Sequence, residues 1–440
     1  MHPKLSANRY ISRFLLVSLN IDAILQETTI HRRRQKLNSM TDGLGLGDAY
    51  STTLGRIKGQ GGEKARLGMA VLMWISHAKR PLKPDELCHA LAVEIGSPNL
   101  NTNNIPPIGT LLSCCQGLVV VDKEASIIRL MHFTLQEYLL AHPQLFGAAH
   151  STIAETCLSY LNSQEVKALP ASHSPDFQSI PFFEYSSLYW GIHAKRELSD
   201  CAKLLALKLF DDFQNHPSIK VLVGAQKGCP PSLKYNESLR FSGLHCASRF
   251  GIDEIVANLV EAEDCDINQK DSSNNTPLVW AARNGHEGTV KILLGRDDIN
   301  PDQKNFLGQT PLHYAAKSGY EGVVKILLGR DDVNPNNRGS FGQTPLNCAA
   351  ENGHEGVVKI LLGRDDVSPD NPGFFDQTPL HCAAQNGHES VVKILLGRDG
   401  VSPNIRDWLC ETPLELATRN SHTKVIALLQ PRKSTTHSTV

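Results

Sequence analysis

The stretch Thr310-Pro311-Leu312-His313-Tyr314-Ala315-Ala316 decides the fold, because variants of it return at a fixed spacing along the second half of the chain. The tripeptide Thr-Pro-Leu begins every 34 residues, at Thr276, Thr310, Thr344, Thr378 and Thr412. One further step back falls on Ser242-Gly243-Leu244-His245, a degenerate first copy. Self-similarity at a period of this length is typical of repeat architectures.

The residues of one copy predict two short helices followed by a projecting loop. Thr310 is a good N-cap and Pro311 suits the first helical turn, where its missing N–H has no cost. Gly319 ends this helix in a conformation that glycine adopts easily. A second helix is expected over 321–328, and a turn and hairpin over 331–343. Because one such unit cannot bury its apolar face alone, the copies must stack.

The repeat resembles the ankyrin repeat, most completely in Thr378–Ala384 and the following Asn386–Leu396. Six copies cover 236–430, with a period of 34 and a lengthened hairpin segment. The resemblance implies an α-solenoid that binds a protein partner through its concave face and hairpin tips. It implies no cofactor, and the histidines at the two repeated positions are expected to make hydrogen bonds within a repeat.

The 440 residues are enough for two or more domains, and the net charge of −1 argues against a general nucleic-acid binder. The eleven cysteines form no regular framework, and Cys246, Cys348 and Cys382 share one repeat position, as packing residues would. A reducing, intracellular setting is therefore expected, in the cytoplasm. The basic run His31–Lys36 leaves nuclear import as an alternative to a solvated helix end. No apolar run approaches the ~18 residues of a membrane span.

No motif for catalysis or cofactor binding is found. Gly59–Lys64 lacks the Gly-Lys-Ser/Thr ending and the preceding strand of a phosphate loop, and it is predicted to be a turn, as is Gly43–Gly47. Cys114-Cys115 has no Cys-x-x-Cys partner for zinc, and no Gly-x-Ser-x-Gly elbow is present. We therefore predict no catalytic, cofactor-binding or metal-binding residues, no small-molecule substrate and no nucleotide hydrolysis.

The chain before the repeats alternates helical and β-branched segments. Helices are predicted over 9–38, 63–79, 84–93, 107–115 and 133–141, and two strands over 118–121 and 126–130. Three helices followed by a β-hairpin and a helix predict a winged-helix domain over 62–142. The third helix carries no Lys or Arg, which disfavours DNA binding by this domain and favours protein contacts.

The segments Trp74–Leu82, Asp85-Glu86-Leu87 and Arg129–Leu139 resemble the winged-helix domain that follows the NACHT nucleotidase in fungal NLR-like (STAND) proteins, often described as the GPI inositol-deacylase winged helix. The resemblance implies that 1–61 is the tail of a NACHT-like module. It also implies a signalling scaffold that corresponds to the C-terminal part of such a receptor. The alternative is the regulatory and sensor half of a NACHT NTPase switch, with its nucleotide-binding core outside this chain.

Residues 143–235 are predicted to be a helical connector and linker. An aromatic-rich helix is expected over 181–198 as a core seam, another helix over 200–213, and a loop over 163–179. The Pro- and Gly-bearing linker at 224–232 predicts that the two halves are separable, and 431–440 is expected to be a disordered tail. The predicted fold class is thus mainly α: a winged-helix and helical region followed by an ankyrin-repeat solenoid.

The candidate partner-binding residues lie in two rows. Apolar side chains recur where consensus ankyrin hairpins are polar: Phe306, Leu307, Phe341, Phe374, Phe375 and Trp408. They are either anchors for a partner or packing residues between long fingers, and the sequence leaves both open. The variable residues that end each first helix face the groove in the family: Arg283, Lys317, Glu351 and Gln385.

Overall fold

The computed structural model describes residues 28–41, 46–169, 179–225, 240–339 and 341–430. The predicted tail at 431–440, most of the predicted linker and the larger part of the predicted helix over 9–38 lie outside these residues. The chain divides into two compact units, Met1–Leu209 and Phe210–Val440. The boundary between them falls inside 143–235, the segment predicted to connect the two halves.

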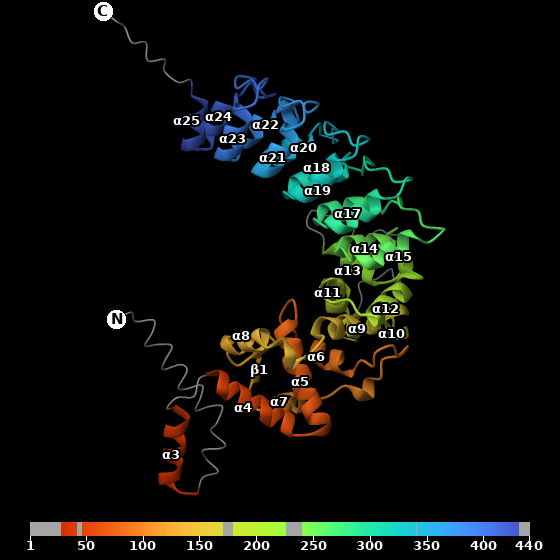
Figure 1. Ribbon diagram of the computed structural model, residues 1–440, viewed down its shortest axis with the longest axis vertical. Coiled ribbons are helices and arrows are strands. Elements are labelled where there is room, and N and C mark those ends of the chain that lie inside the picture. Colours follow the sequence, from red (N-terminus) through yellow and green to blue (C-terminus); the bar gives the residue numbers. More distant parts are fainter. Residues whose placement is uncertain (1–27, 42–45, 170–178, 226–239, 340, 431–440) are drawn as a thin grey trace, which may run out of the picture. The chain divides into compact units, whose positions relative to one another are not determined.

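The first unit contains the expected winged helix (Figure 1). Its helices are α5 (Gly62–His77), α6 (Pro84–Ala92), α7 (Ile108–Cys114) and α8 (Phe133–Ala141). Strands β1 (Val119–Asp122) and β2 (Ile127–Leu130) pair antiparallel, with Val119 opposite Leu130. Leu82 adds a third position to this hairpin, since its carbonyl accepts a hydrogen bond from the Ile128 amide at 2.8 Å.

The two glycine-rich segments that were predicted to be turns agree with the structure to different extents. The turn predicted at Gly59–Lys64 is shorter than expected, because α5 begins at Gly62; the chain turns at Gly61 and Gly62, which have φ of +70° and +51°. The predicted turn at Gly43–Gly47 is wrong at its end, because helix α4 (Leu46–Gly59) begins at Leu46. The aliphatic and aromatic side chains of this helix explain it: Tyr50, Leu54 and Ile57 are buried.

The remaining helices of the first unit enclose an aromatic core. They are α9 (Ala149–Leu161), α10 (Gln164–Lys167), α11 (Phe183–Arg196) and α12 (Asp200–Phe210), and α3 (Ile30–Thr41) lies near the N-terminus of the chain. The predicted core seam is confirmed, because Phe182, Tyr185 and Trp190 are buried. Trp74 of α5 packs edge-on against Phe182, with ring centroids 5.5 Å apart. The short helix α10 replaces the start of the predicted loop over 163–179, and α12 ends at Phe210, three residues before the predicted end.

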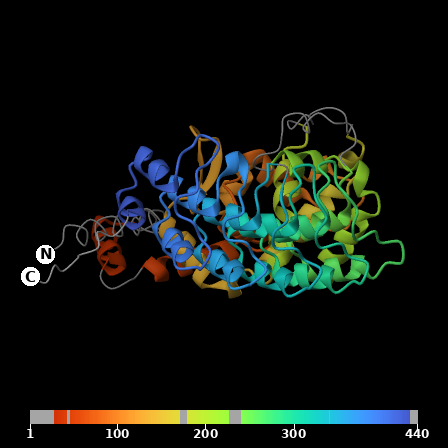
Figure 2. The ribbon, with the colours of Figure 1, turned by 90° about the horizontal axis from the view of Figure 1, so that it is seen from above.

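The second unit stacks six helix pairs in chain order (Figure 1), and Figure 2 shows the same succession of repeats from above, from blue to green. The first helices pack on one another: α14 (Gly243–Phe250), α16 (Pro277–Arg283), α18 (Pro311–Ser318), α20 (Pro345–Glu351), α22 (Pro379–Gln385) and α24 (Pro413–Arg419). The second helices form a parallel row: α15 (Asp253–Val260), α17 (Glu287–Leu294), α19 (Glu321–Leu328), α21 (Glu355–Leu362), α23 (Glu389–Leu396) and α25 (Thr423–Leu429). A one-turn 3-10 helix, η3 (Phe213–Asn215), and α13 (Ser218–Gly224) precede them.

Small side chains allow the helices to approach closely. Ala315 and Ala316 of α18 are fully buried, as are the alanine pairs at the same position of the second, fourth and fifth repeats. Gly319 closes α18 with φ +78°, and an added Cβ atom there would lie 2.6 Å from the His354 ring of the next repeat. Only glycine meets both requirements, since its φ is permissive and it has no side chain.

The repeated histidines are structural, but their hydrogen bonds extend between repeats as well as within them. The ring of His313 bonds Thr310 through Nδ1 and, through Nε2 at 3.0 Å, the carbonyl of Gln343, the last residue of the same repeat. The second histidine row bonds backward: Nε2 of His354 lies 2.9 Å from the Lys317 carbonyl of the preceding repeat. The prediction of bonds within one repeat is therefore confirmed for the first histidine row and wrong for the second, because the second row reaches a carbonyl of the preceding repeat.

Candidate protein-binding surface

The hairpin of each of the first five repeats ends in a five-residue loop, here called a fingertip: 271–275, 305–309, 339–343, 373–377 and 407–411. In each loop the amide of the first residue donates to the carbonyl of the last, with N···O distances of 2.8–3.1 Å. The fourth residue is left-handed in every case: Asn274, Gly308, Gly342, Asp376 and Cys410. This shared geometry places equivalent side chains of successive repeats in the same orientation at the tip.

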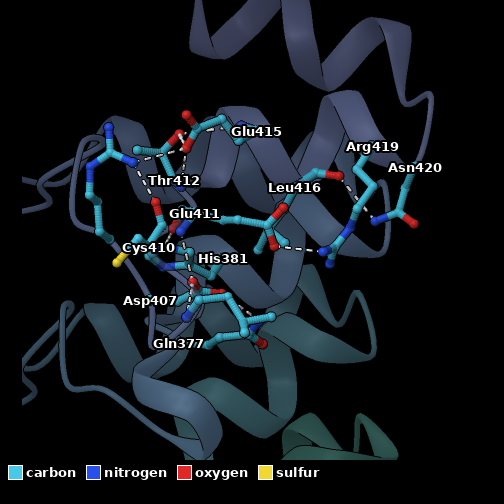
Figure 3. Close-up of polar contacts among 12 residues, drawn as sticks. Gln377, His381, Asp407, Cys410, Glu411, Thr412, Glu415, Leu416, Arg419 and Asn420 are labelled. Carbon is cyan, nitrogen blue, oxygen red and sulfur yellow. Dashed lines mark hydrogen bonds and ion pairs between the residues drawn. The ribbon is translucent and has the colours of Figure 1, made fainter.

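Polar side chains at the base of three fingertips hold the loops in shape. Asp407 Oδ1 accepts from the amides of Leu409 at 3.0 Å and Glu411 at 2.9 Å (Figure 3). Asn305 and Asp271 accept from the equivalent amides of their own loops. Because these three loops are closed by both backbone and side-chain bonds, the side chains at their tips have a fixed position.

The tips carry a row of exposed apolar side chains, which we call the aromatic ridge. Its members are 42–66% exposed: Phe306, Leu307, Phe341, Phe374, Phe375, Trp408 and Leu409. They make up half of the exposed large apolar side chains in the described residues. The first fingertip, Asp271–Asn275, is wholly polar, so the ridge starts at the second fingertip.

The rings of the ridge also contact one another from finger to finger. Phe341 meets Phe374 edge-on at 5.3 Å between centroids, and Phe375 stacks on Trp408 at 5.6 Å. Backbone bonds connect the same fingers, since the Trp408 amide donates to the Phe375 carbonyl at 2.9 Å. The packing alternative therefore describes real contacts, and these contacts leave a large part of every ring exposed to solvent.

Backbone strain is concentrated in the fourth fingertip. Phe375 has φ +55° and ψ +32°, inside the one-turn 3-10 helix η5 (Phe374–Asp376), and Asp376 also has a positive φ of +59°. A bulky residue in the left-handed region is a conformational outlier that neighbouring contacts must maintain. Such strain is concentrated at functional sites, and here it turns both Phe374 and Phe375 toward the ridge contacts described above.

The groove residues predicted from the sequence lie where expected, at the C-terminal ends of the first helices. Lys317 and Glu351 are exposed, and Arg283 and Gln385 are half-buried. Gln343 Nε2 donates to Glu351 Oε2 at 3.0 Å, which ties this groove residue to the base of a fingertip. The side chains at this groove position are therefore positively charged in the second and third repeats, negatively charged in the fourth and neutral in the fifth.

Trp280 and Tyr314 occupy the repeat position that Cys246, Cys348 and Cys382 hold in other copies, and each of these two rings contacts an arginine. The guanidinium of Arg249 lies over the Trp280 ring, 5.3 Å from its centroid, and that of Arg283 lies 5.2 Å from the Tyr314 centroid. The 34-residue spacing from Arg249 to Arg283, and from Trp280 to Tyr314, is the signal that could have identified them.

The cysteines of the described residues are free thiols. Burial raises the pKa of Cys348 and Cys382 to about 12, so both thiols are protonated and unreactive. No group of three or more His, Cys, Asp or Glu side chains suited to hold a metal occurs in the part of the chain that the structure describes. Within the same residues, no helix has the length and apolar character needed to cross a membrane.

Comparison with known protein families matches the second half of the chain to ankyrin repeats, described as three copies. The matches overlap, at 204–305, 244–338, 297–371, 327–407 and 365–438. Together they cover more than half of the 440 residues, and the chain belongs to the ankyrin-repeat proteins.

A second match identifies the domain before the repeats. Residues 56–152 match the winged-helix domain of GPI inositol-deacylase, which includes all of α5 to α8 and the hairpin. No curated protein matches the chain. The predicted fold class, a winged helix followed by an ankyrin solenoid, is thereby confirmed.

Proposed function

We propose that the ankyrin repeats bind a protein partner along the aromatic ridge and the adjacent groove row, and that the chain acts as a non-enzymatic signalling scaffold. Ankyrin repeats themselves indicate protein–protein interaction. The observation that carries the proposal is the ridge, whose rings stay 42–66% exposed although the fingers hold them in fixed positions. Rigid, exposed aromatic side chains give large contact area at little entropic cost.

The order of domains supports a more specific role. A winged helix of this kind followed by ankyrin repeats suits the C-terminal part of a fungal NACHT receptor of the NLR-like class. We propose that the chain supplies the sensing part of such a system, in the cytoplasm or the nucleus, where buried free thiols such as Cys348 persist. The same arrangement would serve the regulatory half of a NACHT NTPase switch.

The proposal predicts that the chain alone does not turn over nucleotide. The segment Gly59–Lys64 contains the end of helix α4 and the start of helix α5, with no preceding strand, so it lacks the setting of a phosphate loop. Purified protein should show no saturable ATP or GTP hydrolysis. Turnover that is abolished by Lys64→Ala would contradict a non-enzymatic scaffold.

Nucleic acid is not the proposed partner. Helix α7, which takes the place of a recognition helix, has the sequence Ile-Gly-Thr-Leu-Leu-Ser-Cys, without a basic residue. Retention on a DNA column that falls steeply with salt would contradict this assignment.

Binding is tested by selecting random 12-residue peptides, displayed on phage, against the full chain. Selected peptides should lose affinity for the Phe341→Ala and Trp408→Ala variants. Ser273→Ala is the matched control, because Ser273 occupies in the polar first fingertip the position that Phe341 holds in the third. Peptides that bind all of these variants equally would show that the ridge is not the binding surface.

A further inference from the structure

A chain of polar contacts in the first unit joins helices α9 and α11 to the end of α5, and we call its members the histidine latch: His150, His193 and Tyr185. Helices α9 and α11 lie side by side (Figure 1), and Nδ1 of His150 is 2.8 Å from Nδ1 of His193. Nε2 of His193 is 3.0 Å from the Tyr185 hydroxyl, whose oxygen accepts a hydrogen bond from the Lys79 amide at 3.1 Å. Because Lys79 directly follows α5, the latch connects the winged helix to the helical connector.

The direction of each hydrogen bond in the latch follows from the groups at its ends. A guanidinium can only donate, and NH1 of Arg196 lies 3.4 Å from Nε2 of His150, so this nitrogen is the acceptor. His150 therefore carries its proton on Nδ1 and donates it to Nδ1 of His193. His193 in turn carries its proton on Nε2 and donates it to the Tyr185 hydroxyl. All of these bonds require that both imidazoles are neutral.

A further proton on either ring breaks one of these bonds. On His193, the proton would occupy Nδ1 and face the Nδ1–H of His150. On His150, the proton would occupy Nε2 and face the guanidinium of Arg196. His193 is also fully buried and His150 partly so, which leaves a charge on either ring with little solvation.

The charged groups around the two rings oppose their protonation on balance. The titratable and charged groups that face the latch are His77 of α5, Lys79 and Arg80 after it, Cys157 of α9, Tyr189 and Arg196 of α11, and Glu197. Arg80 is paired with Glu86, and Oε2 of Glu197 accepts from the His150 amide at the start of α9. Burial, and next the charge of Lys79, lowers the pKa of His150 to about 4, against the opposing charge of Glu197. Burial, and next the charge of His150, lowers the pKa of His193 to about 3.

We propose that the histidine latch is an acid-sensitive joint, which holds the helical connector on the winged helix at neutral pH and releases it when the rings are protonated. Tyr185 makes the connection, since its ring packs against Trp74 of α5 at 6.0 Å between centroids while its hydroxyl holds the Lys79 amide. Loss of the bond from His193 would free this hydroxyl and weaken the contact of α11 with the end of α5. This inference concerns the first unit and does not depend on partner binding by the repeats.

The pH range of the joint follows from the direction of the shifts. The opened latch takes up protons at the ordinary histidine pKa of 6.5, and the closed latch takes them up at His150 only near a pKa of about 4. The contribution of the latch is therefore fully present above about pH 6.5 and is lost as the pH falls toward 4. Linkage through one such ring makes the opening constant roughly 30-fold larger at pH 5 than at pH 7.5.

Amide hydrogen exchange of the full chain, read by mass spectrometry and corrected for the intrinsic exchange rate, measures this opening. Peptides from α9 and α11 should exchange about 10- to 30-fold faster at pH 5 than at pH 7.5, while peptides from α7, which has no histidine, should change much less. His150→Asn keeps a donor to Nδ1 of His193, and its amide can turn over to accept when that ring is protonated. In this variant the pH effect should fall to a few-fold. His142→Asn is the matched control and should keep the full effect, because Nδ1 of His142 bonds the Tyr138 carbonyl of α8, outside the latch.

A second variant tests the latch without a change in either ring. Arg196 is exposed, so Arg196→Gln should fold, and it keeps a donor near His150 while it removes a positive charge. Its pH effect should be smaller than that of the parent. Circular dichroism at pH 7.5 confirms that each variant is folded.

Three results would overturn the proposal. The first is equal corrected exchange of α9 and α11 at the two pH values in the parent protein. The second is a pH effect as large as that of the parent in folded His150→Asn or in Arg196→Gln. The third is an equal rise of exchange in α7, which would indicate general acid unfolding in place of a local joint.

Discussion

The ring of Phe375 stacks on the indole of Trp408, with centroids 5.6 Å apart and planes inclined by 16°. The Trp408 amide donates to the Phe375 carbonyl, so backbone and side chains connect the same two fingertips. Trp408 remains 66% exposed in spite of this contact. One pair of residues can therefore stabilise the fingers and still present a surface to a partner.

The first prediction concerns the stability of this pair. Phe375→Ala and Trp408→Ala should each lower the free energy of unfolding by roughly 1 kcal/mol, because aromatic pairs contribute about 0.5–1.5 kcal/mol beyond burial. The double variant should cost less than the sum, since the contact is lost only once. Urea denaturation of the four proteins measures this coupling. Strictly additive costs would show that the stacked rings do not stabilise each other.

The second prediction concerns acid sensitivity of the repeats. Burial lowers the pKa of His313 to about 4, against an ordinary value of 6.5, because the protonated ring is disfavoured in the fold. The unfolded chain therefore binds more protons between these values. The contribution of His313 to the free energy of unfolding is therefore fully present above about pH 6.5 and is lost as the pH falls toward 4.

The fourth repeat supplies the matched variant for this test. Asn347 stands at the position of His313 and makes the same bonds: Nδ2 donates to the Gln377 carbonyl at 3.1 Å, and Oδ1 accepts from the Thr344 hydroxyl. His313→Asn should therefore fold normally and lose less stability between pH 7 and 4.5 than the parent. Equal pH dependence of the two proteins, measured by urea denaturation, would show that His313 does not contribute to acid sensitivity.

The third prediction concerns a ladder of alternating Asn and Asp at 34-residue spacing: Asn268, Asp302, Asn336 and Asp370. Nδ2 of Asn336 donates to the Asp366 carbonyl, while Oδ1 of Asp302 is buried without a hydrogen-bond partner. Burial raises the pKa of Asp302, so its carboxylate costs stability that is regained as the pH falls and the group takes up a proton. Asp302→Asn should therefore stabilise the protein at pH 7, by about 1 kcal/mol for the added bond.

The reciprocal change provides the control for this ladder. Asn336→Asp removes the donor to the Asp366 carbonyl and should destabilise the protein at pH 7, with part of the loss recovered at low pH. Thermal melting of both variants at pH 7 and pH 4 measures the effects. A loss of stability in Asp302→Asn at pH 7 would contradict this account of the ladder.

The fourth prediction concerns the glycine that closes helix α18. Gly319→Ala should destabilise the repeats by about 2 kcal/mol, because φ is +78° and the new Cβ atom would meet the His354 ring. Gly329→Ala, at the end of α19 with φ −74°, is the control and should have little effect. Similar losses for both variants in chemical denaturation would contradict the specific role of Gly319.

The fold could be predicted from the sequence because its signals are local. Thr310, Pro311 and Gly319 specify a helix start and end without reference to distant residues, and the 34-residue period gives the stacking. Helix α4 was not predicted because the glycines at its start are typical of a turn, and because the burial of its apolar face depends on tertiary packing. The contacts between fingertips, and the Nε2 bonds of His313 and His354, join residues about 30 positions apart or more, and local sequence patterns do not report on such contacts.

The candidate site could be predicted in part. Phe341 and Trp408 were found because consensus ankyrin repeats have polar residues at these fingertip positions. The contacts of Arg249 with Trp280 and of Arg283 with Tyr314 were not found, because cation–ring geometry depends on how helices α14, α16 and α18 are placed beside one another. Residue type and spacing in the sequence do not give the distance between an arginine on one helix and a ring on the next.

The central claim, that the aromatic ridge binds a protein partner, is tested most directly by titration calorimetry of a selected peptide with the folded full chain. Phe341→Ala and Trp408→Ala should each weaken binding by about 2 kcal/mol or more, roughly 30-fold in Kd, while Ser273→Ala binds as the parent does. Thermal melts of the same preparations correct for the folded fraction. An unchanged Kd for the folded Phe341→Ala and Trp408→Ala proteins, accompanied by a lowered Tm, would show that the ridge only packs the fingers together.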